Sequence, residues 1–246
     1  MAIETREWDS RFFGYPVGAV SFLEPPDIKA DILPVLHQAT QAGIRLLYLV
    51  TPPVPDRLCL AMQRAGATPV GTKVEYSKNI NNVIPDKKSN FICLCSEHSP
   101  ALESLALQSG FYSRFRMDAG FQNREFERLY SEWLKSSLRG ENGKRVYIAG
   151  NIHEPHGLIT VEPNGIVRIG LLAVGPQWRG QGLGHQLVIE AERFCHRNGH
   201  KELSVATQAN NQNACRFYDY CGFQRIAEKQ YFHAWLPLIE STKSYP

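Results

Sequence analysis

A glycine-rich segment offers the clearest chemistry in this chain. Residues 177–184 carry glycines at positions 180, 182 and 184, and they lie between an apolar run at 169–174 and an amphipathic run that begins near Gln181. A strand, a glycine turn and a helix start together make an anion site, because the first amides of a helix have no internal partner and the helix dipole adds partial positive charge. The segment is therefore predicted to hold a pyrophosphate.

Two classes of pyrophosphate carrier fit this segment. A dinucleotide site needs Gly-x-Gly-x-x-Gly after a strand. Gly180 and Gly182 satisfy that pattern, but His185 stands where the third glycine belongs, and Glu202 lies about where a ribose-binding acid would be expected. The second class is an acyl-coenzyme A (CoA) site. A glycine turn that binds nothing is the remaining alternative.

Two motifs resemble those of the GNAT N-acetyltransferases. Residues 179–184, Arg-Gly-Gln-Gly-Leu-Gly, match Gln/Arg-x-x-Gly-x-Gly/Ala, and residues 211–223 match Asn-x-x-Ala-x-x-(apolar)-Tyr-x-x-x-Gly-Phe. The second motif starts 27 residues after Gly184, which leaves room for a helix and a strand. The resemblance covers roughly residues 90–238. It implies an α/β (α+β) protein with the GNAT fold, a mixed central sheet flanked by helices, and transfer of an acyl group from acyl-CoA.

The resemblance also assigns cofactor-binding residues. The strand before the glycines would pair with the pantetheine arm of CoA, and the amides of residues 179–185 would hold the pyrophosphate. Asn211 would contact the cofactor, fix its loop or cap its own helix. The predicted cofactor-binding residues are Leu172, Ala173, Val174, Arg179, Gly180, Gln181, Gly182, Leu183, Gly184, His185 and Asn211. The donor would be acetyl-CoA or a larger acyl-CoA, and no metal is expected.

Acyl transfer from a thioester requires an oxyanion site, a proton donor to the leaving thiolate and a route for the amine's proton. Amides of residues 172–174 could stabilise the oxyanion. Tyr218 occupies the family's general-acid position, and a phenol with a pKa of about 10 stays protonated at neutral pH; packing as a core aromatic is its alternative role. For the general base, His153 and Glu154 are candidates by polarity only, and a solvated turn is the alternative.

Shorter blocks at residues 8–14, 113–116, 169–173 and 205–208 resemble one GNAT branch, the dTDP-fucosamine acetyltransferases. This branch acylates nucleotide-linked amino sugars for surface polysaccharides such as the O-antigen of lipopolysaccharide, and it suggests a homodimer. The loop at 110–118 interleaves arginines with aromatic residues, which suits a nucleotide diphosphate and a base or sugar face. The predicted substrate-binding residues are Tyr112, Arg114, Phe115 and Arg116, with packing on the core as the alternative.

The elements that position these residues divide the chain in two. Residues 1–85 are predicted to form a small α/β domain and residues 91–246 the GNAT domain, with the polar stretch at 81–90 as the boundary. The first domain includes a helix at 28–42, capped by Asp27 and kinked or started late by Pro34.

Further expectations concern the second domain. Periodicity predicts a helix at 123–138 with Asn123 as its cap, and two strands near Arg225 and Tyr231. Pro155 is expected in a turn. Tyr231, His233 and Trp235 alternate on the last strand, where they either line the acceptor pocket or pack.

Composition excludes several classes of protein. The 246 residues are 43% hydrophobic with a net charge of +3, which argues against a nucleic-acid partner. Apolar runs stay below the roughly 18 residues needed to span a membrane, and the first residues do not resemble a signal peptide. The six cysteines contain no Cys-x-x-Cys, so we expect them reduced in a cytoplasmic protein.

Four functions therefore remain open, the most distant of which is a dinucleotide oxidoreductase. The resemblance favours an N-acyltransferase that acts on a dTDP-linked amino-deoxysugar. A GNAT enzyme for another small amine is the main alternative within the enzyme class. A non-catalytic sensor that binds CoA or a nucleotide is the alternative outside it.

Overall fold

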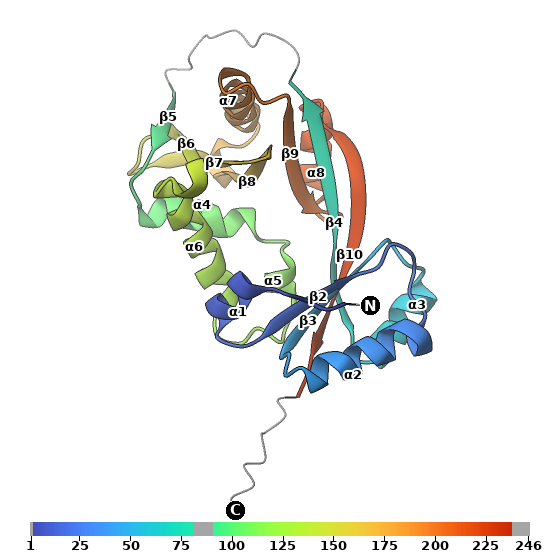
Figure 1. The fold of residues 1–246 in the computed structure, drawn as a ribbon. Coiled ribbons are helices and arrows are strands. Elements are labelled where there is room, and N and C mark those ends of the chain that lie inside the picture. Colours follow the sequence, from blue (N-terminus) through green and yellow to red (C-terminus); the bar gives the residue numbers. More distant parts are fainter. Residues whose placement is uncertain (1, 81–90, 238–246) are drawn as a thin grey trace, which may run out of the picture. The chain divides into compact units, whose positions relative to one another are not determined.

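The computed structural model describes residues 2–80 and 91–237, so the boundary predicted at 81–90 lies outside the described residues. Helices flank one mixed sheet, which confirms the predicted α/β class (Figure 1). Its strands are hydrogen-bonded in the order β1-β2-β3-β10-β4-β9-β8-β7-β6-β5. Among the described residues, no helix has the length and apolar character needed to cross a membrane.

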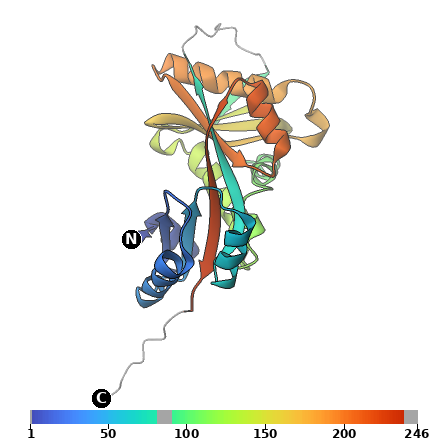
Figure 2. The same cartoon turned by 90° about the vertical axis from the view of Figure 1, so that its right-hand side faces the viewer.

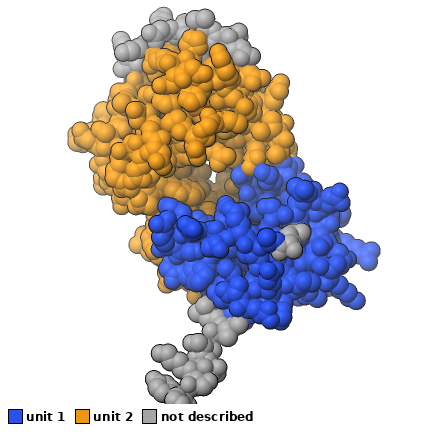
Figure 3. Space-filling view, in the orientation of Figure 1, with its two compact units in different colours: residues 1–73, 117–120, 228–246 blue, residues 74–116, 121–227 orange. Residues whose placement is uncertain are grey.

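The chain forms two compact units (Figure 3). Of the described residues, the first unit comprises 2–73, 117–120 and 228–237, and the second comprises 74–80, 91–116 and 121–227. Strands β4 (Thr68–Asn79) and β10 (Gln224–Trp235) each contribute residues to both units.

The first unit packs helices on a short mixed sheet. β2 pairs in parallel with β3, and β3 pairs antiparallel with the C-terminal part of β10. Asp27 accepts hydrogen bonds from the amides of Lys29 and Ala30, as expected of a cap. A π-helical turn precedes the α-helix, which has Pro34 in its first turn. The elements are β1 (Glu4–Thr5), α1 (Glu7–Phe13), β2 (Val17–Ser21), η1 (Ile28–Ile32), α2 (Leu33–Gln41), β3 (Leu46–Thr51) and α3 (Asp56–Arg64).

The second unit places a sheet between helices. Helix α7 packs on β7 and β8 by an apolar face that includes Leu187, Val188 and Ala191, and Figure 2 shows α4 and α6 on the other side of these strands. The remaining elements are β5 (Ile92–Cys95), α4 (Pro100–Ser109), α5 (Arg114–Met117), α6 (Glu125–Leu138), η2 (Glu141–Gly143), β6 (Arg145–Gly150), β7 (Pro155–Asn164), β8 (Ile166–Val174), η3 (Pro176–Trp178), α7 (Leu183–Arg197), β9 (Glu202–Gln208) and α8 (Gln212–Tyr220).

Two local expectations for helices were wrong. The segment at 110–118 contains the short helix α5, because the Ser113 hydroxyl accepts a hydrogen bond from the Phe115 amide and caps it. Asn123 does not cap α6. Instead its amide donates to the Glu125 carboxylate at 2.7 Å, and Arg124 enters the helix from a left-handed conformation.

Two expectations for strands were also wrong. The two strands expected near Arg225 and Tyr231 are one strand, β10, because no glycine or proline interrupts residues 224–235. Pro155 does not lie in a turn: it opens β7, where residues 155–161 are mostly buried and pair with β6. A proline is tolerated at the first position of a strand.

Asp118 is the centre of a buried cluster of polar side chains in the first unit. The His233 imidazole is fully buried, with Nδ1 2.6 Å from Asp118 Oδ2, and the Trp235 indole donates to the same oxygen at 2.9 Å. The Gly120 amide donates to Oδ1 at 2.8 Å. Burial by itself would raise the pKa of Asp118, but the hydrogen bond and charge of His233, with the donors of Gly120 and Trp235, hold that pKa below its ordinary value.

Replacing Asp118 by asparagine should therefore destabilise the protein. We expect the free energy of unfolding at pH 7 to fall by about 2 to 4 kcal/mol, because a buried charged partner is lost. Because the folded pKa is lowered, the contribution is complete above the unfolded carboxyl pKa of about 3.9 and is lost as the pH falls through the lower folded value. Urea unfolding at pH 7 and pH 3 checks this, with exposed Glu24→Gln as control. Equal stability of Asp118→Asn and wild type at pH 7 would contradict it.

Candidate functional site

A cleft of about 810 Å³ lies in the second unit, at the ends of β8 and α4 and the starts of α7 and α8. All predicted cofactor-binding residues except Gln181 line it. The exposed side chain of Gln181 instead donates to the Gln177 carbonyl at 3.3 Å. The glycine turn and the second motif thus meet in one cleft.

The glycine turn presents backbone to this cleft. Gly180 and Gly182 have φ of 76° and 77°, and a Cβ added to either would meet no described atom within 4 Å. The first backbone hydrogen bond of α7 runs from the Gln186 amide to the Gly182 carbonyl. The preceding amides, from Leu183 to His185, are the free donors of a helix start, which suit a phosphate.

Strands β8 and β9 separate beside the cleft. Their ladder pairs residues 167–169 with residues 203–205 and ends there, although β8 continues to Val174 and β9 to Gln208. A smaller cavity of about 100 Å³, here called the slot, lies between the separated strands. The slot and the cleft share Leu172 and Tyr218 as lining residues, so the backbone of β8 is open to a ligand at this point.

A β-bulge marks the point where the strands separate. Gly170 and Leu171 of β8 lie opposite the single residue Thr160 of β7. The Leu171 amide donates to the Thr160 hydroxyl at 2.8 Å, and Thr160 is fully buried. A side-chain oxygen therefore replaces the carbonyl of a regular ladder and redirects β8 along the slot.

Tyr218 lies on α8 with only 6% of its surface exposed, and it lines both the slot and the cleft. Burial, with smaller effects from Cys221, Cys215 and Tyr76, raises the pKa of its phenol. The group therefore stays protonated throughout the neutral range, which suits a proton donor. Asn211 both caps α8, through a 3.2 Å hydrogen bond from the Ala214 amide, and lines the cleft.

Two side-chain donors occupy the end of β8: Arg179, which belongs to the motif, and Gln108, which the motifs did not include. The Gln108 amide and the Arg179 guanidinium both donate to the Val174 carbonyl, at 2.9 and 3.1 Å. The Arg179 side chain is therefore folded onto the strand. The ring of Trp178, also in the cleft lining, stacks on His156 with centroids 3.5 Å apart. The cleft is also lined by residues that were not predicted from the sequence: Ser109, Phe111, Asn213, Ala214, Phe217 and Tyr220.

The predicted substrate-binding residues are divided by the fold. Tyr112 lines both the cleft and the slot, whereas Arg114, Phe115 and Arg116 line neither. Phe115 is buried against the rings of Trp133 on α6 and of Phe121, which precedes α6. The Arg114 guanidinium lies 4.3 Å from the ring centroid of Phe115. The Arg116 guanidinium lies 3.6 Å from the ring centroid of Phe111, which is half exposed and faces the cleft.

Other candidates from the sequence lie elsewhere. His153 and Glu154 are exposed and their amides donate to the Asn151 side chain, so neither lines the cleft or the slot. Glu202 lies on β9 and accepts a hydrogen bond from Ser77, outside the cleft. The acid needed for a dinucleotide ribose is thus missing from this cleft. Within the described residues, no cluster of three or more His, Cys, Asp or Glu side chains is arranged to hold a metal ion.

The residues that line this cleft lie within a segment that matches a known protein family. Residues 107–223 match the model of the acetyltransferase (GNAT) family. The chain carries a GNAT acetyltransferase domain. It is 29% identical over 166 residues to a dTDP-fucosamine acetyltransferase of Escherichia coli O6:H1, which covers 66% of this chain and 69% of that protein. The family supports a CoA-dependent acyltransferase.

Other relatives are more distant. The spore coat polysaccharide biosynthesis protein SpsD of Bacillus subtilis is 23% identical, and the match covers 55% of this chain and 47% of that protein. The crystal structure of a GCN5-related N-acetyltransferase from Sphaerobacter thermophilus is similar with a TM-score of 0.56 at 15% identity, over 91% of this chain and 75% of that one. At this level of identity the likeness shows a shared fold and no more.

Proposed function

We propose that the protein transfers an acyl group from acyl-CoA to the amine of a dTDP-linked amino-deoxysugar, for a surface polysaccharide. The observation that carries the proposal is that the cleft and the slot share lining residues, which brings the start of helix α7, the open edge of β8 and the Tyr218 phenol together. The two relatives named for a dTDP-sugar and for a polysaccharide support this acceptor class. The same resemblance extends the proposal to a cytoplasmic homodimer.

In this proposal, backbone groups bind three parts of the donor: the pyrophosphate, the pantetheine arm and the oxyanion. The amides of Leu183, Gly184 and His185 hold the pyrophosphate, and the β8 backbone near Leu172 and Ala173 pairs with the pantetheine arm. This places the thioester in the slot, beside the bulge held by Thr160. Backbone amides there stabilise the tetrahedral oxyanion.

Tyr218 acts when the tetrahedral intermediate collapses. The carbon–sulfur bond breaks, and the thiolate leaves with its electron pair and takes the phenolic proton or a hydrogen bond from it. Because the phenol is protonated at neutral pH, it can donate this proton or hydrogen bond in every turnover. The exposed ring of Phe111, held by Arg116, and Tyr112 beside it supply the flat surface for a base or sugar.

Release of free thiol from acetyl-CoA tests this function. The purified protein is assayed with a panel of dTDP-amino sugars that differ in amine position, and with spermidine, amino acids and aminoglycosides. We expect release with at least one amino sugar and little with the other amines. Release with a small amine and with none of the sugars would refute the sugar acceptor, and CoA binding without release for any amine would favour a sensor.

A further inference from the structure

A third hollow adjoins the slot on the open face of the sheet. This recess, of about 430 Å³, is lined by residues of β4, β7, β8, β9 and β10. It shares Val205 and Ala206 with the slot, just as the cleft shares Leu172 and Tyr218 with it. A reactive carbon in the slot would therefore have the cleft, which is proposed to hold the donor, on one side and the recess on the other.

Glu162 of β7 is a carboxylate that lies beside this junction. It lines the recess, and a Cβ built on Gly170 would lie 2.5 Å from its Oε1. The carboxylate therefore lies directly over a residue that lines the slot. The same Cβ would lie 2.7 Å from the Thr160 hydroxyl, so only glycine at 170 lets both side chains occupy the bulge.

We propose that Glu162 is the general base, which removes the proton of the acceptor ammonium at the mouth of the slot. This inference rests on the proposed acyltransferase function. The ammonium N–H proton passes to the Glu162 carboxylate, and the freed nitrogen lone pair forms a bond to the thioester carbon. Collapse then expels the CoA thiolate toward Tyr218. Tyr218 protonates the thiolate to give the free CoA thiol, the resulting phenolate takes the second proton from the nitrogen, and Glu162 returns its own proton to water through the recess.

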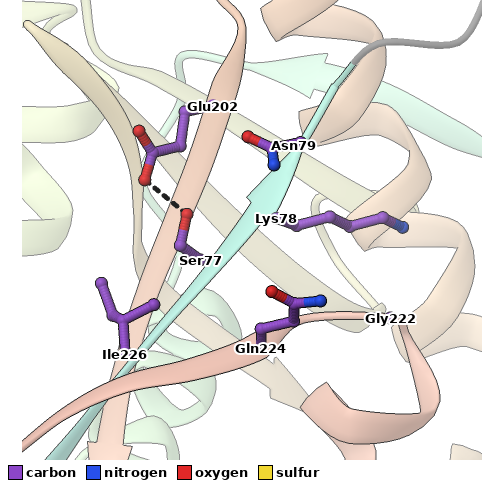
Figure 4. A pocket seen from close by; sticks show the side chains of 7 residues that line it. All are labelled: Ser77, Lys78, Asn79, Glu202, Gly222, Gln224 and Ile226. Carbon is purple, nitrogen blue, oxygen red and sulfur yellow. Dashed lines mark hydrogen bonds between the residues drawn. The ribbon is translucent and has the colours of Figure 1, made fainter.

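Several charged and titratable groups surround Glu162. Arg168 is its register partner on β8, and Glu75, Tyr76 and Glu202 line the recess from β4 and β9. At the start of β6, Arg145 pairs with Val161, and the Lys144 ammonium donates to Ser136. Glu202 accepts a hydrogen bond from the Ser77 hydroxyl in an adjacent hollow (Figure 4). It is a second glutamate near the recess that does not contact Gly170, so it serves as a matched control for Glu162.

The pH dependence of Glu162→Gln tests this role. We expect kcat/KM for the acceptor to fall by about 100-fold near neutral pH, the lower range for a general base. The remaining rate should rise tenfold per pH unit through the alkaline range, because only free amine then reacts, whereas the wild-type rate should level off at a lower pH. The affinity for CoA should not change. Glu202→Gln should keep the wild-type rate and pH profile.

Two acceptors separate this inference from the proposed function. Each variant is assayed with the best dTDP-amino sugar and with 2-aminoethanol at high concentration. If the wild type uses 2-aminoethanol but none of the sugars, the sugar proposal fails, and the profile with 2-aminoethanol still decides the role of Glu162. Superimposable pH profiles of the wild type and Glu162→Gln, with either acceptor, would overturn the inference. So would a loss of CoA affinity or of thermal stability that accounts for the lower rate.

Discussion

Replacing Tyr218 by phenylalanine should lower kcat by about 100- to 1,000-fold, because the leaving thiolate loses its proton donor. The side chain is buried and lines both the cleft and the slot. Phenylalanine fills nearly the same volume, so the packing of α8 and the shape of the slot should survive. The dissociation constant of CoA should stay within about twofold, since the pyrophosphate and pantetheine contacts are made by backbone groups. Steady-state kinetics and calorimetric titration with CoA measure the two quantities separately.

Tyr76→Phe is the matched control for this experiment. Tyr76 is also a buried tyrosine, with its ring centroid 5.8 Å from that of Tyr218, and its hydroxyl interacts with Cys215. Removing its hydroxyl tests whether losing any buried phenol in this cluster slows the reaction. We expect a small change in kcat for Tyr76→Phe. An equal loss in both variants, or unchanged turnover in Tyr218→Phe, would remove Tyr218 from the chemistry.

The parts of the site that depend on backbone chemistry could be predicted from the sequence. Gly180 and Gly182 adopt positive φ, which glycine reaches without strain, and the helix that follows begins where the apolar periodicity starts. Such features follow local rules. The motif spacing then put Tyr218 and Asn211 on one helix near the same loop, and the structure places both in the cleft lining.

Contacts between residues distant in the sequence could not be predicted in this way. The loop at 110–118 offers several aromatic rings, and the sequence does not say that Phe115 packs on α6 while Phe111 faces the cleft. The same holds for Gln108, which reaches the end of β8, and for Glu162, whose position depends on a bulge in the neighbouring strand. His233 and Asp118 are 115 positions apart, and no periodicity links them.

Replacing Gly182 by valine should nearly abolish CoA binding. Gly182 lines the cleft where the pyrophosphate is proposed to lie, and a Cβ there would meet no described atom within 4 Å. A branched side chain at this position should therefore displace the pyrophosphate from the amides of α7. Losing two hydrogen bonds to a charged phosphate costs about 3 to 6 kcal/mol. That loss corresponds to a dissociation constant raised by about 100-fold or more.

Gly199→Val separates this steric effect from backbone strain. Gly199 follows the other end of α7 with φ of 73°, and a Cβ there also meets no described atom within 4 Å. Valine should therefore destabilise both sites similarly, by at least the roughly 1 to 2 kcal/mol of a left-handed residue. Only Gly182→Val should also lose CoA binding in calorimetric titration and the thermal stabilisation that CoA gives. Full CoA affinity in a folded Gly182→Val protein would mean that the pyrophosphate binds away from the start of α7, and the assignment of the thioester to the slot would fail with it.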